Sequence, residues 1–132
     1  MRKLKFYLLL LAVASIAFAG CKKSDSAYVP VDYTVNLVGN YGSLTWSGYA
    51  SSGTIVITKG SLEANGDCKN IKITINATPS KYFYATVASG KYTFTITGGD
   101  SNDSGTGALT GQNLSINYTN TTSTSSYTAI KN

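Results

Sequence analysis

The chain has 132 residues, a formal net charge of +5, two cysteines and no histidine. Without histidine the chain lacks the commonest general base, the usual nitrogen ligand of zinc and every Ser-His or Cys-His nucleophile. We therefore expect a protein that is not an enzyme, with no catalytic residues, no metal site and no cofactor.

The N-terminus has the pattern of a secretory signal that ends in a lipid attachment point. A basic start precedes an apolar run over residues 6–19, which is too short to cross a bilayer core of about 30 Å as a helix. The sequence "FAGC" at 18–21 resembles the bacterial lipobox, in which small residues precede a cysteine that is acylated. We expect residues 1–20 to be a lipoprotein signal peptide and Cys21 to carry the acyl chains that hold the protein to the membrane.

Removal of the signal peptide changes the charge of the chain. The remainder holds eight lysines, six acidic residues and no arginine, a net charge of +2, so the basic character of the whole chain does not indicate nucleic-acid binding. Lys22 follows the cysteine at a position where aspartate is associated with inner-membrane retention. We expect a protein anchored in the outer membrane of the cell envelope, either periplasmic or exposed at the cell surface.

Residues 21–32 are predicted to tether the lipid to the folded domain. They show no periodic apolar face and contain Pro30, as is typical of linkers. Within them, "DSA" at 25–27 resembles the short acceptor motif of O-glycosylation in Bacteroidota, which would place a glycan on Ser26. No feature of the sequence predicts an oligomeric state.

From residue 33 onward the chain predicts antiparallel strands. Apolar and polar residues alternate in several segments, which together make about eight strands. The clear segments are 53–60, 70–77, 81–88, 91–98 and 113–119, and the weaker ones are 33–47, 106–110 and 125–130. Short Gly-containing turns at 89–90 and 111–112 predict hairpins, and two longer linkers are expected at 60–69 and 98–105.

Each predicted strand has one apolar face, so one side of the sheet is solvated. An open sheet of eight strands would leave two free edges and an uncovered apolar face. For residues 33–132 we therefore predict an all-β domain that is a single small antiparallel up-and-down β-barrel of about eight strands. A β-sandwich is the alternative, because both folds bury alternate residues. The predicted core consists of Ile, Phe, Tyr and Leu side chains with Trp46.

Four stretches carry a family resemblance across most of the chain after the signal peptide. In chain order they are "LVGNYGSLTWSG", "GTIVITKGS", "FYATVASGKYTFTI" and "SGTGALTGQNLSINYT". In this pattern the chain resembles small lipoproteins of Bacteroidota type with a lipocalin-like (calycin-like) β-barrel domain. The resemblance implies a barrel at the cell envelope and specifies no chemistry.

Four aromatic residues are candidates for a ligand or partner surface: Trp46, Tyr82, Tyr84 and Tyr92. Such rings stack on sugar rings and anchor protein partners. The three tyrosines are expected to lie close together across the hairpin that segments 81–88 and 91–98 form, with Tyr92 on the apolar face of its strand. Cross-strand packing is their alternative role.

The remaining reactive groups are predicted to have structural roles. Cys68 stands in a loop without an activating base, so an inert, partly buried thiol is expected. The pairs Glu63–Asp67 and Asp100–Asp103 are interpreted as solvated turn acids and not as the facing carboxyls of a glycosidase.

These observations favour a non-enzymatic binding module for a small apolar ligand, a lipid or a glycan. The alternative is a protein-interaction or inhibitor module with a filled barrel, acting through the loops 60–69 and 98–105. The expected partners are the membrane, through the anchor, and the small ligand, but not nucleic acid. A cavity of several hundred Å³ would favour ligand binding, whereas a barrel filled by side chains would favour the alternative.

Overall fold

The computed structural model describes residues 27–132, and every helix or strand assigned in that part of the chain is a β-strand. The all-β prediction is confirmed. The strands are β1 (Gly39–Trp46), β2 (Tyr49–Ala50), β3 (Thr54–Lys59), β4 (Asn70–Asn76), β5 (Lys81–Val87), β6 (Thr93–Gly99), β7 (Ser104–Thr110), β8 (Asn113–Thr119) and β9 (Thr124–Lys131).

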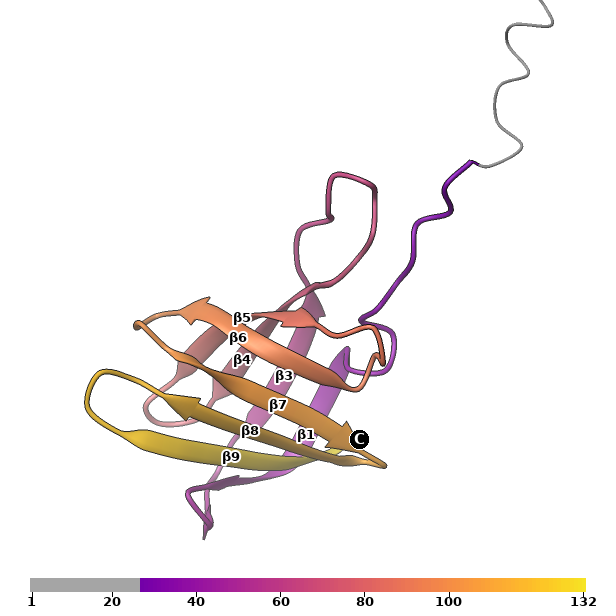
Figure 1. Cartoon of the computed structure of the whole chain (residues 1–132). Helices are drawn as coiled ribbons and strands as arrows, with labels where there is room; N and C mark the ends of the chain where they lie inside the picture. The colour runs from indigo at the N-terminus through magenta and orange to yellow at the C-terminus, as the bar shows by residue number, and fades with distance from the viewer. Residues whose placement is uncertain (1–26) are drawn as a thin grey trace, which may run out of the picture.

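The strands form a closed up-and-down barrel (Figure 1). From β3 to β9 each strand pairs antiparallel with the next, and β1 pairs antiparallel with both β3 and β9. The β1–β9 pairing closes a ring of eight strands and leaves the short β2 outside it. The predicted barrel is therefore confirmed, and the sandwich alternative is wrong, because a sandwich would have left β1 and β9 unpaired at sheet edges.

Three boundaries differ from the sequence-based expectation. The weak segment 33–47 begins as a turn, and its strand starts only at Gly39. The linker expected at 98–105 is a loop over residues 100–103, since β6 and β7 extend into it. Strand β2 was not predicted; it returns from β1 through Ser47 and Gly48, whose positive φ angles of 49° and 86° suit a tight hairpin turn.

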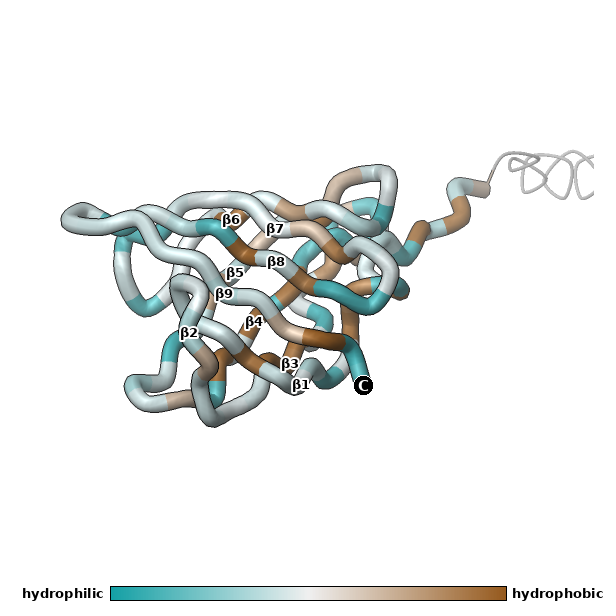
Figure 2. The backbone as a smooth tube through the Cα atoms, turned by 90° about the horizontal axis from the view of Figure 1, so that it is seen from below, coloured by the Kyte–Doolittle hydropathy of each residue, from teal (hydrophilic) through white to brown (hydrophobic). Residues whose placement is uncertain are grey.

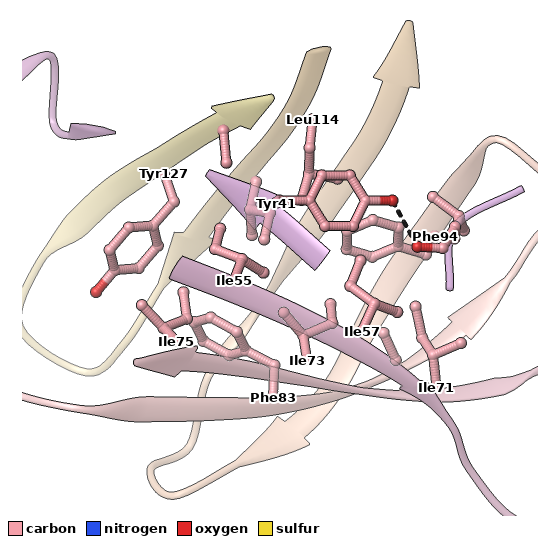
Figure 3. Close-up of a cluster of buried hydrophobic side chains, with 14 of the residues drawn as sticks. Tyr41, Ile55, Ile57, Ile71, Ile73, Ile75, Phe83, Phe94, Leu114 and Tyr127 are labelled. Atoms are coloured by element: carbon pink, nitrogen blue, oxygen red, sulfur yellow. Dashed lines mark hydrogen bonds between the residues drawn. The ribbon is translucent and has the colours of Figure 1, made fainter. Parts of the chain in front are cut away.

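The interior of the barrel is filled by side chains. Apolar residues recur between paler polar ones along the strands (Figure 2), and the inward set forms one buried cluster. The rings of Tyr41, Phe83 and Phe94 occupy its centre among the isoleucines of β3 and β4 (Figure 3). The prediction that Trp46 belongs to this core is wrong, because its side chain is 46% exposed at the last position of β1.

One end of the barrel is closed by the N-terminal segment, residues 27–38. Leu37 is fully buried there, and its carbonyl accepts a hydrogen bond from the Tyr41 hydroxyl. From the last strand, the Lys131 ammonium donates to the carbonyl of Asn36. These contacts attach the segment to β1 and β9, and we call this end of the barrel the sealed end.

The long loop between β3 and β4 holds the rest of the N-terminal segment in place. Asp67 of this loop is 2% exposed and accepts hydrogen bonds from the Tyr28 hydroxyl and, at 2.8 Å, from the Val31 N–H. The N–H of Cys68 donates to the Val31 carbonyl at 3.0 Å. Within residues 27–32, which we expected to belong to the tether, Tyr28, Val31 and Asp32 thus contact the β3–β4 loop.

The predicted signal peptide (1–20), the lipidation site Cys21 and the glycosylation candidate Ser26 all lie outside the described residues. Within residues 27–132, no helix has the length and apolar character needed to cross a membrane.

Candidate functional site

The end of the barrel opposite the sealed end contains a pocket of about 290 Å³. Its lining comes mainly from the connections 47–53, 77–80 and 100–103. These connections lie at the end of the ring away from the indigo N-terminal segment (Figure 1). We call it the mouth pocket. Its lining residues are Trp46, Ser51, Ala77, Thr78, Pro79, Ser80, Lys81, Asp100, Ser101, Tyr118 and Tyr127.

A ladder of aromatic rings leads from the core through the mouth pocket to the surface. The Phe83 ring lies 5.0 Å from that of Tyr118, centroid to centroid, and Tyr118 stacks on Tyr127 at 5.6 Å with 8° between the planes. Tyr127 in turn stacks on Trp46 at 6.5 Å. The Tyr127 hydroxyl points away from the isoleucine cluster (Figure 3). The ladder thus anchors an exposed ring, Trp46, on buried neighbours.

Beside the ladder, one lysine bridges two carboxylates. The Nζ of Lys81 lies 2.9 Å from Asp103 Oδ2 and 3.5 Å from Asp100 Oδ1. The Asp103 side chain is fully buried, whereas that of Asp100 is 33% exposed and faces the pocket. One ammonium against two carboxylates gives the cluster a formal charge of −1, and Lys81 has no charge left for a further anion.

Burial and neighbouring groups shift the pKa values of Lys81 and Tyr127. Burial lowers the pKa of Lys81, but the hydrogen bond and charge of Asp103, with the charge of Asp100, outweigh it, so the net pKa is raised. Burial also raises the pKa of Tyr127, and the neighbouring Tyr118 hydroxyl adds to the effect. At neutral pH Lys81 is therefore protonated, with its charge balanced by the carboxylates, and Tyr127 carries a hydroxyl that can donate a hydrogen bond.

Hydroxyl side chains complete the lining. Ser51, Thr78, Ser80 and Ser101 contribute one each. A hydroxyl both donates and accepts, and the exposed Asp100 carboxylate accepts only. A flat aromatic wall with such groups at its edge suits a small ring that has apolar faces and hydroxyl-bearing edges.

No family model, curated protein or solved structure matches this chain. The site is therefore interpreted from its own chemistry. In the described part of the chain, no three Cys, Asp or Glu residues come together as a group that could hold a metal ion.

The four aromatic residues singled out in the sequence occupy three different places. Trp46 lines the mouth pocket. Tyr82 and Tyr84 lie on the outer wall of β5, 5.5 Å apart between ring centroids, under the Lys72 ammonium. The expectation that Tyr92 joins them is wrong: it precedes β6 in the turn at the sealed end and is 51% exposed, so it also leaves the apolar face predicted for it.

Two of the acidic residues expected to be solvated are buried. Asp67 and Asp103 are 2% and 4% exposed, and each has a partner from a distant part of the chain. Asp67 accepts from the N-terminal segment, and Asp103 pairs with Lys81. Cys68 is a free thiol and is buried, with 6% exposure, which is deeper than the partial burial that we expected.

Sequence reasoning missed Lys81, Tyr118 and Tyr127 as members of one site. The signal was present in the predicted topology. In an up-and-down sheet every second connection lies at the same end, so the start of one strand and the end of the next are neighbours. Lys81 begins β5, Tyr118 stands near the end of β8 and Tyr127 near the start of β9, which brings all three to the mouth.

Proposed function

We propose that this protein is a non-enzymatic binding module that holds a small glycan at the mouth of its barrel. The observation that carries the proposal is Trp46, an exposed ring that rests on Tyr127 beside a pocket lined by hydroxyls. Burying an exposed aromatic face against a sugar ring removes apolar surface from water, while the hydroxyls and Asp100 satisfy the polar edge of the ring.

A glycan fits these observations better than a lipid or another apolar ligand. The buried cluster fills the interior, and the mouth pocket, at about 290 Å³, lies at the lower limit of the roughly 300–1,000 Å³ of typical ligand pockets. An acyl chain needs a long apolar channel, whereas this pocket offers hydroxyls and a carboxylate. Its size and lining favour a single polar ring.

The filled interior agrees with the alternative, an interaction module acting through two long loops, but the positions of those loops do not. The loop 60–69 is engaged with the N-terminal segment at the sealed end, while residues 100–103 lie at the mouth. The two loops are separated by the length of the barrel (Figure 1) and form no joint surface.

The location that we propose suits an extended glycan as ligand. If Cys21 is acylated, the membrane anchor leads to residue 27 and so to the sealed end. The mouth pocket then opens on the side of the domain away from the anchor, where a polymer of the envelope or the cell exterior is within reach.

Ligand titration with a matched pair of variants tests the proposal. Trp46 is the only tryptophan, so its fluorescence reports directly on the mouth when neutral oligosaccharides of glucose, galactose and mannose are added to the purified protein. Calorimetry then compares Trp46→Ala with Tyr84→Ala, whose ring is equally exposed (48%) but lies on the outer wall. We expect Trp46→Ala to weaken binding by about tenfold or more and Tyr84→Ala to leave it unchanged.

Two results would contradict this function. One is a panel in which no saccharide changes the fluorescence or releases heat, and the other is equal binding by both variants and the unaltered protein. Native mass spectrometry provides a third check, since a lipid retained on the purified protein would favour the apolar ligand.

A further inference from the structure

A second hollow adjoins the mouth pocket. It lies on the β1–β2 hairpin, has a volume of about 480 Å³ and is lined by residues 46, 47, 49, 50 and 51. Trp46 and Ser51 also line the mouth pocket, so the two hollows meet at these residues. We call the second one the hairpin hollow.

The hairpin hollow differs from the mouth pocket in chemistry. Its main lining groups are the rings of Trp46 and Tyr49, which are 46% and 79% exposed. Two exposed rings that line one hollow form a small aromatic patch, and contiguous apolar patches of this kind mark binding sites. The hairpin places Tyr49 directly opposite Trp46 in the β1–β2 ladder, so the two side chains emerge from neighbouring backbone positions.

The charge of the lining residues determines whether the two hollows favour charged or uncharged sugars. Lys81 is the one cation among the lining residues of both hollows, and Asp103 and Asp100 already neutralise it. The net formal charge of −1 opposes a carboxylate or sulfate brought into the mouth. Nothing in the lining opposes an uncharged ring.

We propose that the ligand is an uncharged oligosaccharide of at least two rings, with one ring in the mouth pocket and the next over Tyr49 in the hairpin hollow. Trp46 then lies beneath the linkage between them. This inference rests on the proposed function and adds the length and the charge of the glycan. The closed barrel supplies the platform, because Trp46 stacks on Tyr127 and the hairpin places Tyr49 opposite Trp46.

The experiment measures dissociation constants for one sugar at three lengths. The single ring, the disaccharide and the tetrasaccharide of the best neutral sugar in the panel are titrated against the purified protein, with the matching uronic acid as the charged probe. We expect affinity to rise about tenfold from one ring to two. The uronic acid is expected to bind about tenfold more weakly than its neutral counterpart at low salt.

Two variants locate these effects. Tyr49→Ala, at an exposed position, should abolish the gain from the second ring while the single ring binds as before. Asp100→Asn removes one negative charge from the mouth. It should therefore reduce the difference in affinity between the neutral sugar and the uronic acid. A thermal unfolding curve for each variant confirms that it is folded.

The possible outcomes distinguish failure of the two-ring site from failure of the proposed glycan-binding function. If saccharides bind but a single ring binds as tightly as longer chains, or Tyr49→Ala keeps the gain, the two-ring site is wrong and the binding module stands. If the uronic acid binds as well as the neutral sugar, the charge argument is wrong. If no saccharide of any length binds, the proposed function itself fails.

Discussion

At the scale of single residues, the buried carboxylates of Asp67 and Asp103 make their contacts at different ends of the barrel. Asp67 accepts hydrogen bonds from Tyr28, Val31 and Asn65 and ties the N-terminal segment to the barrel. Asp103 is paired with Lys81 at the mouth and shapes the charge of the candidate site. A buried carboxylate without such partners would cost several kcal/mol, so each of these two residues depends on contacts made by a distant part of the chain.

The acidic groups of the sealed end predict how stability depends on pH. Hydrogen bonds from Tyr28 and the Val31 N–H lower the pKa of Asp67, and Lys59 lowers that of Asp32 to about 2. Because both pKa values in the folded state lie below the unfolded value of 3.8, the stabilisation is fully present above about pH 4 and is lost as the pH falls toward 2. Urea unfolding measured from pH 7 to pH 2 should show this loss.

The variant Asp67→Asn is the control for this dependence. It should be less stable than the unaltered protein at pH 7 and should lose less stability between pH 4 and pH 2, since an amide does not titrate there. If Asp67→Asn loses as much stability between pH 4 and pH 2 as the unaltered protein does, Asp67 does not hold the N-terminal segment.

At the scale of elements, β7 shows how small residues make room for large ones. Its inward positions include Gly107, which pairs with Phe94 of β6. A Cβ at Gly107 would overlap the Phe94 ring, which is itself buried with 2% exposure. Pairing small residues with large ones in this way allows the aromatic side chains to pack inside a narrow barrel.

Alanine at two strand glycines tests this packing. Gly107→Ala should destabilise the protein by about 1–3 kcal/mol through overpacking. Gly98→Ala, in β6, is the matched control: nothing lies within 4 Å of the added methyl group, so stability should be unchanged or slightly higher because alanine restricts the unfolded chain. Urea unfolding of both variants measures the difference, and equal stabilities would contradict the packing described for Phe94.

At the scale of the whole molecule, the two ends of the barrel differ in the residues that cover them. The sealed end receives the N-terminal segment, and the C-terminus lies beside it (Figure 1). The mouth holds the aromatic ladder and the charged cluster. A cylinder closed at the end where the chain enters leaves the other end free for a ligand.

Separation of the two ends predicts that anchoring and binding are independent. Cys21→Ser should move the protein from the membrane fraction to the soluble fraction, because acyl chains at that cysteine are the proposed anchor. The same variant should bind saccharides with unchanged affinity. A Cys21→Ser protein that still fractionates with membranes would contradict the anchor, whereas loss of saccharide binding would contradict the independence of the ends.

The sequence by itself determined the class of fold. Alternation such as Ile71, Ile73 and Ile75 is a local property, since successive side chains of a strand point to opposite faces, and short turns make neighbours antiparallel. From these two facts follow the strands, their order and the need for closure. The sequence also indicated Trp46 as a candidate for a binding surface, although not its place at the rim.

Only the tertiary structure decided what the ends of the barrel are. Whether a loop residue is buried depends on which distant segment covers it, so the enclosure of Asp67 by residues near 30 has no local signature. Lys81 and Asp103 are likewise brought together by the register of β5 against β6 and by the loop that follows β6. Local periodicity specifies which face of a strand is apolar; closure of the ring and the path of the loops specify which polar groups meet.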